Sequence, residues 1–162
     1  MSVKTPVTTV TLNPAFLQEI KDSNPDLART RQELRQCCRG NQPPSLVAGH
    51  LIRLLDELRD HLALQFALEE AYGFMEVHQS LANPAAAEAK RQHCGLYLEI
   101  SELCERAEEL QYRGLAVQQF GSIVQQLEQF DQRLRRHDQF EEKLIEQAAD
   151  RHKGNELGVQ NA

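Results

Sequence analysis

The sequence predicts an all-α protein, folded as an antiparallel up-down-up-down four-helix bundle. The chain is rich in Leu, Ala, Glu, Gln and Arg, contains no Trp and has few β-branched residues after its first dozen positions, which is typical of helices. Its apolar residues recur at alternating spacings of three and four, as on the buried face of a helix. Turn-forming residues divide the chain into four long segments with short connections, and short connections favour antiparallel neighbours.

The length of 162 residues is that of one domain with a sizeable core. We expect residues 14–150 to form the bundle. Residues 1–13 precede the first helix signal, and residues 151–162 contain Gly and Asn but few apolar side chains. Both end segments are therefore predicted to be flexible tails.

The first helix is predicted to run from Pro14 to about residue 38, from the capping and helix-breaking residues at its two ends. Asn13 can cap its N-terminus, and proline is well suited to the first helical position. Pro25 lies inside this segment, where it removes one backbone donor and crowds the preceding turn. We therefore expect the first helix to be kinked or split near Pro25.

The other three helices follow from similar signals. Ser45 is the expected cap of a second helix that reaches about residue 79. Asn83 precedes another proline and is expected to cap a third helix, which ends near residue 114. The fourth helix is predicted to span residues 117–150.

Polar residues interrupt the apolar seams of all four predicted helices. In an up-down-up-down bundle, the starts of the first and third helices lie level with the ends of the second and fourth. Counted from that common end at ~1.5 Å per residue, all the interruptions fall within roughly one and a half turns of one level. The sequence therefore predicts one polar layer across the bundle, formed by Asn24, Gln65, Glu69, His93, His137 and Glu141.

The most informative interruption is in the fourth helix. His137 and Glu141 are four residues apart and so lie on one face, where they can share a metal ion or pair with each other. Gln65 and Glu69 repeat this spacing in the second helix, with an amide in place of the imidazole. His61, one turn before Gln65 on nearly the same face, is the most plausible further histidine for this site.

This pattern resembles the haemerythrin family, whose module is also called the HHE cation-binding domain. The resemblance covers residues 14–150 and is carried by His137-x-x-x-Glu141-Glu142, by Gln65-x-x-x-Glu69-Glu70 and by His93. It implies a four-helix bundle that holds non-haem iron, often as a di-iron pair that binds oxygen or senses oxygen, iron or redox state.

The chain departs from the family pattern at several ligand positions. Asn24 and Gln65 stand where the resemblance implies histidines, and Ala89 cannot supply the additional third-helix histidine of the oxygen carriers. A neutral amide oxygen is a weaker donor to iron than imidazole or carboxylate. A di-iron centre is therefore not expected, and the candidate ligands for one non-haem iron or other divalent metal are Glu69, His93, His137 and Glu141.

Two functional hypotheses follow from this degenerate site. In the first, protonated His93 and His137 balance Glu69 and Glu141 in a metal-free network, and the protein is a non-oxygen-carrying binding, sensing or structural module. In the alternative, the same residues bind one iron or zinc ion in a protein involved in iron, oxygen or redox sensing. Neither is an enzyme, because ferritin-like oxidases use Glu-x-x-His, with the opposite order and a spacing of three.

Charge and composition limit the classes of binding partner that we expect. The formal net charge of −6 argues against nucleic-acid binding, and the short cluster of Arg133, Arg135 and Arg136 is interpreted as solvated helix surface. No apolar stretch approaches the roughly 20 residues of a membrane helix, so no membrane partner is expected. Helix faces rich in Gln and Glu are suited to binding a second copy of the chain, as a homo-oligomer, or an unidentified protein partner. The alternative is that these faces are ordinary solvent-exposed surface.

The cysteines indicate the compartment. Cys37, Cys38, Cys94 and Cys104 show no C-x-x-C spacing, and two of them are adjacent, so neither a zinc site nor a disulfide framework is predicted. Reduced thiols are typical of a cytoplasmic protein, which is the location that we expect.

Overall fold

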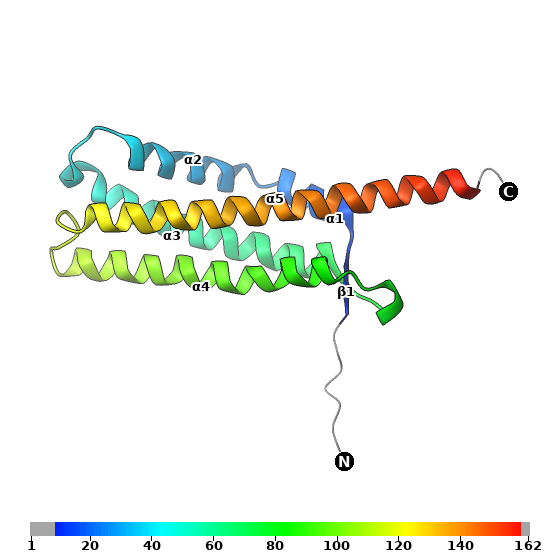
Figure 1. Cartoon of the computed structure of the whole chain (residues 1–162). Coiled ribbons are helices and arrows are strands. Elements are labelled where there is room, and N and C mark those ends of the chain that lie inside the picture. Colours follow the sequence, from blue (N-terminus) through cyan, green and yellow to red (C-terminus); the bar gives the residue numbers. More distant parts are fainter. Residues whose placement is uncertain (1–8, 160–162) are drawn as a thin grey trace, which may run out of the picture.

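The computed structural model describes residues 9–159, and within them the chain is mostly helical (Figure 1). Two short strands and two single helical turns, one π (η1) and one 3-10 (η2), interrupt the helices. The elements in chain order are β1 (Val10–Leu12), α1 (Pro14–Asp22), α2 (Pro25–Arg39), α3 (Pro44–Leu68), η1 (Glu69–Gly73), β2 (Phe74–Glu76), η2 (Gln79–Leu81), α4 (Pro84–Tyr112) and α5 (Phe120–Val159).

The long helices pack side by side. Helix α3 contacts α2 and α4, α4 contacts α5, and the short α1 packs on η1 and α5. The α2–α3 and α4–α5 connections lie at the same end of the molecule, so successive long helices run in opposite directions (Figure 1). This confirms the predicted helical class, with long helices in mutual contact. No helix in the described part of the chain is sufficiently long and apolar to cross a membrane.

Asparagine side chains cap three helices, two of them, at Asn13 and Asn83, as predicted. Asn13, Asn24 and Asn83 accept hydrogen bonds from backbone N–H groups in the first turns of α1, α2 and α4. The cap at Asn24 also confirms the split near Pro25, because α1 ends at Asp22 and α2 begins only a few residues later, at Pro25 itself.

The predicted start and end of the second helix were wrong. Helix α3 begins at Pro44 without a side-chain cap, because proline fits the first helical position and moves the start ahead of Ser45. The same helix ends at Leu68, well before residue 79. Beyond Leu68 the chain makes one π turn and then strand β2. The backbone N–H and C=O groups of β2 pair with β1 and not with a further turn of helix.

Both ends of the described chain are more regular than the predicted tails. Val10 and Leu12, which fall in the predicted N-terminal tail, lie in β1, are buried and pair with Glu76 and Phe74 of β2. Residues 1–8 of that tail lie outside the described part. Helix α5 continues past residue 150 to Val159, so most of the expected C-terminal tail is helical, and only residues 160–162 are not described.

The core consists of two apolar clusters with polar residues between them. The larger extends along α2 to α5 and includes Leu62, Leu96 and Leu134. The smaller lies around β1 and α1 and includes Leu17 and Leu144. Glu69, His93, His137 and Glu141 lie, along each helix, at the boundary between the two clusters and are themselves buried.

Candidate metal centre

Four side chains from three elements converge at this boundary. Glu69 begins η1 at the end of α3, His93 lies in α4, and His137 and Glu141 lie one turn apart in α5. Their exposed fractions are 0%, 2%, 3% and 0%, respectively. One donor atom from each side chain lies within 4.8 Å of every other. The predicted candidate ligands are thus brought together in one enclosed group.

The short separations in this group match those of neighbouring metal ligands. Nε2 of His93 is 3.1 Å from Oε2 of Glu69 and 3.5 Å from Oε2 of Glu141. Nε2 of His137 is 3.1 Å from Oε1 of Glu141. Ligands bound at about 2.0–2.1 Å and about 90–110° apart are separated by roughly 3 Å, so these pairs fit one ion. The widest separations require a small inward movement of the side chains.

The atoms that face one another lie at ion-pair distance, but they are not aligned as hydrogen bonds. Among the described residues, Oε2 of Glu69, Nε2 of His93, Nε2 of His137 and Oε2 of Glu141 are buried without a hydrogen-bond partner. Buried polar atoms are normally paired, because an unpaired one loses its hydration without compensation. Four such atoms directed at one small volume are suited to a shared cation.

Neutral amides hold the candidate ligands from outside. Nε2 of Gln65 donates to Oε1 of Glu69 at 3.1 Å, and Nδ2 of Asn24 donates to Oε1 of Gln65 at 3.0 Å. Nδ1 of His137 lies 2.8 Å from Oε1 of Gln92, an acceptor, so Nδ1 carries the hydrogen. The Nε2 lone pair of neutral His137 is then free to bind a metal, as is usual for metal-bound histidines.

The predicted polar layer is therefore present, but its members have different roles. Gln65 orients Glu69, and Asn24 reaches only Gln65 while it caps α2. His61 lies beside Asn24 and Gln65 at the edge of a hollow and is not part of the four-residue group.

Lys21 belongs to this site although the sequence pattern did not predict it. Its ammonium group lies 2.8 Å from Oε1 of Glu141 and 3.8 Å from Oδ1 of Asp138, and only 14% of its side chain is exposed. The available signal was its position in α1, four residues after the fully buried Leu17 and therefore on the same face. That signal is weak, because lysine is almost never buried unless it is paired.

Comparison of the chain with protein-family models, with curated proteins and with solved structures gives no match. The resemblance to haemerythrins therefore rests on the residues of this cluster.

Burial and charge act against each other throughout the cluster. Burial disfavours the charged forms of His93 and Lys21, but the carboxylates of Glu141 and Glu69 raise the pKa of His93 to about 9 and also raise the pKa of Lys21. Burial likewise raises the pKa of Glu69, whereas at Glu141 burial is outweighed by the two histidines and Lys21, which lower the pKa. When Glu69 and Glu141 are both ionised, positive charges on His93 and Lys21 balance them in the metal-free protein.

Aromatic rings enclose the histidines. The ring of Phe66 stacks on His93, with centroids 4.2 Å apart and planes 7° from parallel, and meets His137 edge-on. The ring of Phe74 meets His93 edge-on, with centroids 5.9 Å apart. These contacts fix the imidazole of His93 and keep water away, which strengthens electrostatic interactions inside the cluster.

Proposed function

We propose that this protein is a haemerythrin-like four-helix bundle that binds one divalent metal ion, iron or zinc, as a binding or sensing module. The ligands are Glu69, His93, His137 and Glu141. The observation that carries the proposal is the group of buried, unpartnered donor atoms from these four residues. Imidazole and carboxylate donors suit both metals, and the two carboxylates neutralise a divalent ion.

Lys21 favours one ion over two. Its ammonium group contacts Glu141, so a second cation near this carboxylate would face a fixed positive charge. Gln65 and Asn24 already hydrogen-bond each other and Glu69, which leaves these amides as supports and not ligands. The proposal therefore excludes oxygen carriage by a di-iron pair, and iron-loaded protein is expected to show no reversible oxygen-dependent visible band.

We also propose a role without catalysis. The four candidate ligands are at most 3% exposed, which leaves them little surface to offer a substrate. Burial raises the pKa of Cys38 to about 11 and that of Cys104 to about 12, so these thiols are protonated at neutral pH and are poor nucleophiles.

The second candidate is a structural polar layer without metal. The observation that favours it is the ion pair between Lys21 and Glu141. With Lys21 and His93 charged, the two carboxylates are balanced without an added cation. The poor alignment of these contacts counts against this candidate, because a network selected for stability would align the buried groups as hydrogen bonds.

Thermal unfolding with added metal separates the two candidates. Anaerobic ferrous ion or zinc should stabilise the parent protein, by ~2.7 kcal/mol when the free ion is a hundred times its dissociation constant. Glu69→Gln should abolish this gain, because it removes an anionic ligand. Glu142→Gln removes an exposed carboxylate next to the cluster and should leave the gain unchanged. Equal responses of Glu69→Gln and the parent, or no response in the parent, would contradict metal binding at this site.

A further inference from the structure

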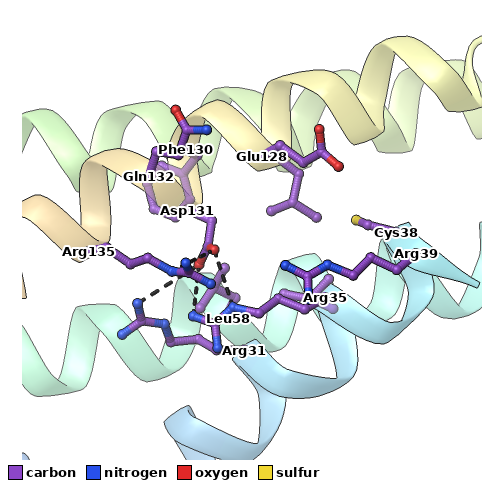
Figure 2. A pocket seen from close by; sticks show the side chains of 12 residues that line it. Arg31, Arg35, Cys38, Arg39, Leu58, Glu128, Phe130, Asp131, Gln132 and Arg135 are labelled. Atoms are coloured by element: carbon purple, nitrogen blue, oxygen red, sulfur yellow. Dashed lines mark hydrogen bonds and ion pairs between the residues drawn. The ribbon is translucent and has the colours of Figure 1, made fainter.

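A pocket of about 170 Å³ lies between α2 and α5, outside the metal cluster (Figure 2). Its walls combine guanidinium groups with apolar side chains. Arg31, Arg35 and Arg39 come from α2 and Arg135 from α5, while Leu58 and Phe130, which are almost fully buried, form the apolar base of the pocket. This composition is unusual in a chain whose formal net charge is −6.

The pocket has more positive than negative charge. Four arginines line it, but only two carboxylates, those of Asp131 and Glu128. Asp131 is shared, since Arg35 donates to both of its oxygens at 3.2 Å and Arg135 lies 3.2 Å away (Figure 2). One carboxylate therefore cannot neutralise the surrounding guanidinium groups.

Two arginines retain unused donors. Arg39 is exposed at the pocket and forms no ion pair or side-chain hydrogen bond with the described residues. Arg31 directs one terminal nitrogen to Asp138 at 2.7 Å, but its Nε is buried without a partner within the same part of the chain. Ion pairs with Asp131 thus occupy Arg35 and Arg135, whereas the exposed Arg39 keeps its donors available to a ligand.

We infer that this pocket binds a small organic anion, a carboxylate with a short apolar body. Arginine presents a planar fork of donors that matches a carboxylate, and Arg39 is the unpaired guanidinium available to receive it. The apolar body packs on Cys38 and on the small surface that Leu58 and Phe130 expose at the base of the pocket. The volume sets the size, because a cavity of about 150 Å³ accommodates benzene whereas drug-sized ligands need about 300 Å³ or more.

The neighbouring thiol supports an unreactive binding role. Cys38 lines the pocket, and burial together with Glu128 raises its pKa to about 11, so it is a neutral, weakly polar wall at physiological pH. The pocket thus offers charge at the arginines and apolar contact elsewhere, and the ligand is bound without covalent chemistry.

Titration with benzoate tests this inference on the full chain. Benzoate should bind saturably and shift the methyl NMR signals of Leu58 and Leu127, which line the pocket. Arg39→Gln should weaken binding about tenfold, as expected for loss of a charge-assisted hydrogen bond. Arg91→Gln removes another exposed arginine, from α4 and away from the pocket, and should leave binding unchanged.

Two further ligands identify which features of benzoate are recognised. Benzamide has the same shape without the charge, and inorganic phosphate has the charge without the apolar body; each should bind at least tenfold more weakly than benzoate. Absence of saturable benzoate binding would overturn the inference. It would also be overturned if both arginine variants weakened binding equally, or if phosphate bound as tightly as benzoate.

Discussion

His93 is held in its charged form by its surroundings. Although burial disfavours the imidazolium, Glu141 and Glu69 raise the pKa of His93 from 6.5 to about 9. A folded-state pKa above the unfolded value means that the folded state binds the proton more tightly. The resulting stabilisation is fully present below about pH 6.5 and is lost as the pH rises through about 9.

The metal-free protein should therefore become less stable between pH 6.5 and 9, by a few kcal/mol, on the order of 3, as this difference in pKa implies. Denaturant unfolding of chelator-treated protein at several pH values measures the loss. His93→Gln should flatten the curve in this range. A stability that is constant or rises with pH would show that His93 is neutral in the folded protein.

Lys21 is expected to limit the affinity of the cluster for metal. At an effective dielectric constant of about 20 and about 5 Å, the repulsion between an ammonium group and a cation is on the order of 3 kcal/mol per unit charge. Lys21→Met should raise metal affinity at least tenfold, and it should destabilise the metal-free protein by about 1–3 kcal/mol because Glu141 loses a partner. Calorimetric metal titration and unfolding measure the two effects.

Lys143→Met provides the control for Lys21→Met. Lys143 is exposed on α5, close in sequence to Glu141. Its replacement should change neither the metal affinity nor the stability of the metal-free protein. Unchanged or weaker metal binding in Lys21→Met would contradict the assigned role of Lys21.

At the scale of single residues, the sequence predicted the buried ligands but not their supports. Glu69, His93, His137 and Glu141 interrupt apolar seams, and such interruptions are visible without a structure. Lys21 and Gln92 occupy positions where long polar side chains usually point to water. Their roles depend on how α1 and α4 are placed against α5, which the sequence pattern alone does not determine.

The π turn η1 connects the cluster to the N-terminal part of the chain. Glu69 begins this turn, and Gly73 ends it with its carbonyl oxygen accepting a hydrogen bond from the N–H group of Asn13 at 2.8 Å. A Cβ atom on Gly73 would lie 2.8 Å from Cδ1 of Leu17, which is fully buried. The absence of a side chain at Gly73 therefore allows α1, and with it Lys21, to pack close to the cluster.

Gly73→Ala should destabilise the protein by about 1–3 kcal/mol, because the added methyl group overpacks Leu17. Gly95 lies exposed in α4, where an added Cβ atom would meet no other atom within 4 Å, so Gly95→Ala should stabilise by about 1 kcal/mol through helix propensity. Denaturant unfolding compares the two variants. Equal effects of both changes would contradict the close approach of α1 to η1.

At the scale of elements, helix starts were easier to predict than helix ends. The Asn-Pro pairs at Asn13, Asn24 and Asn83 mark starts through local chemistry, a side-chain cap followed by a proline. The end of α3 and the β1–β2 pairing depend on contacts between segments far apart in sequence, such as Leu12 with Phe74. A short strand in a predicted tail leaves too little pattern to be recognised.

Across the whole molecule, ion pairs link the anion pocket to the metal cluster. Arg31 lies near Asp131 in the pocket and contacts Asp138, Asp138 lies near Lys21, and Lys21 contacts Glu141. These contacts join α1, α2 and α5 on one side of the polar layer. Two apolar clusters enclose that layer from either end, so the cluster is buried at the point where the helical segments meet.

The metal content of the protein tests the central claim most directly. Protein purified without a histidine tag or chelator should contain about one iron or zinc ion per chain by elemental analysis. The His137→Ala variant should contain none, because it loses one of the four ligands. Parent protein that takes up no iron or zinc, even after incubation with either ion, or a variant that retains the parent's full metal content, would contradict a metal centre at Glu69, His93, His137 and Glu141.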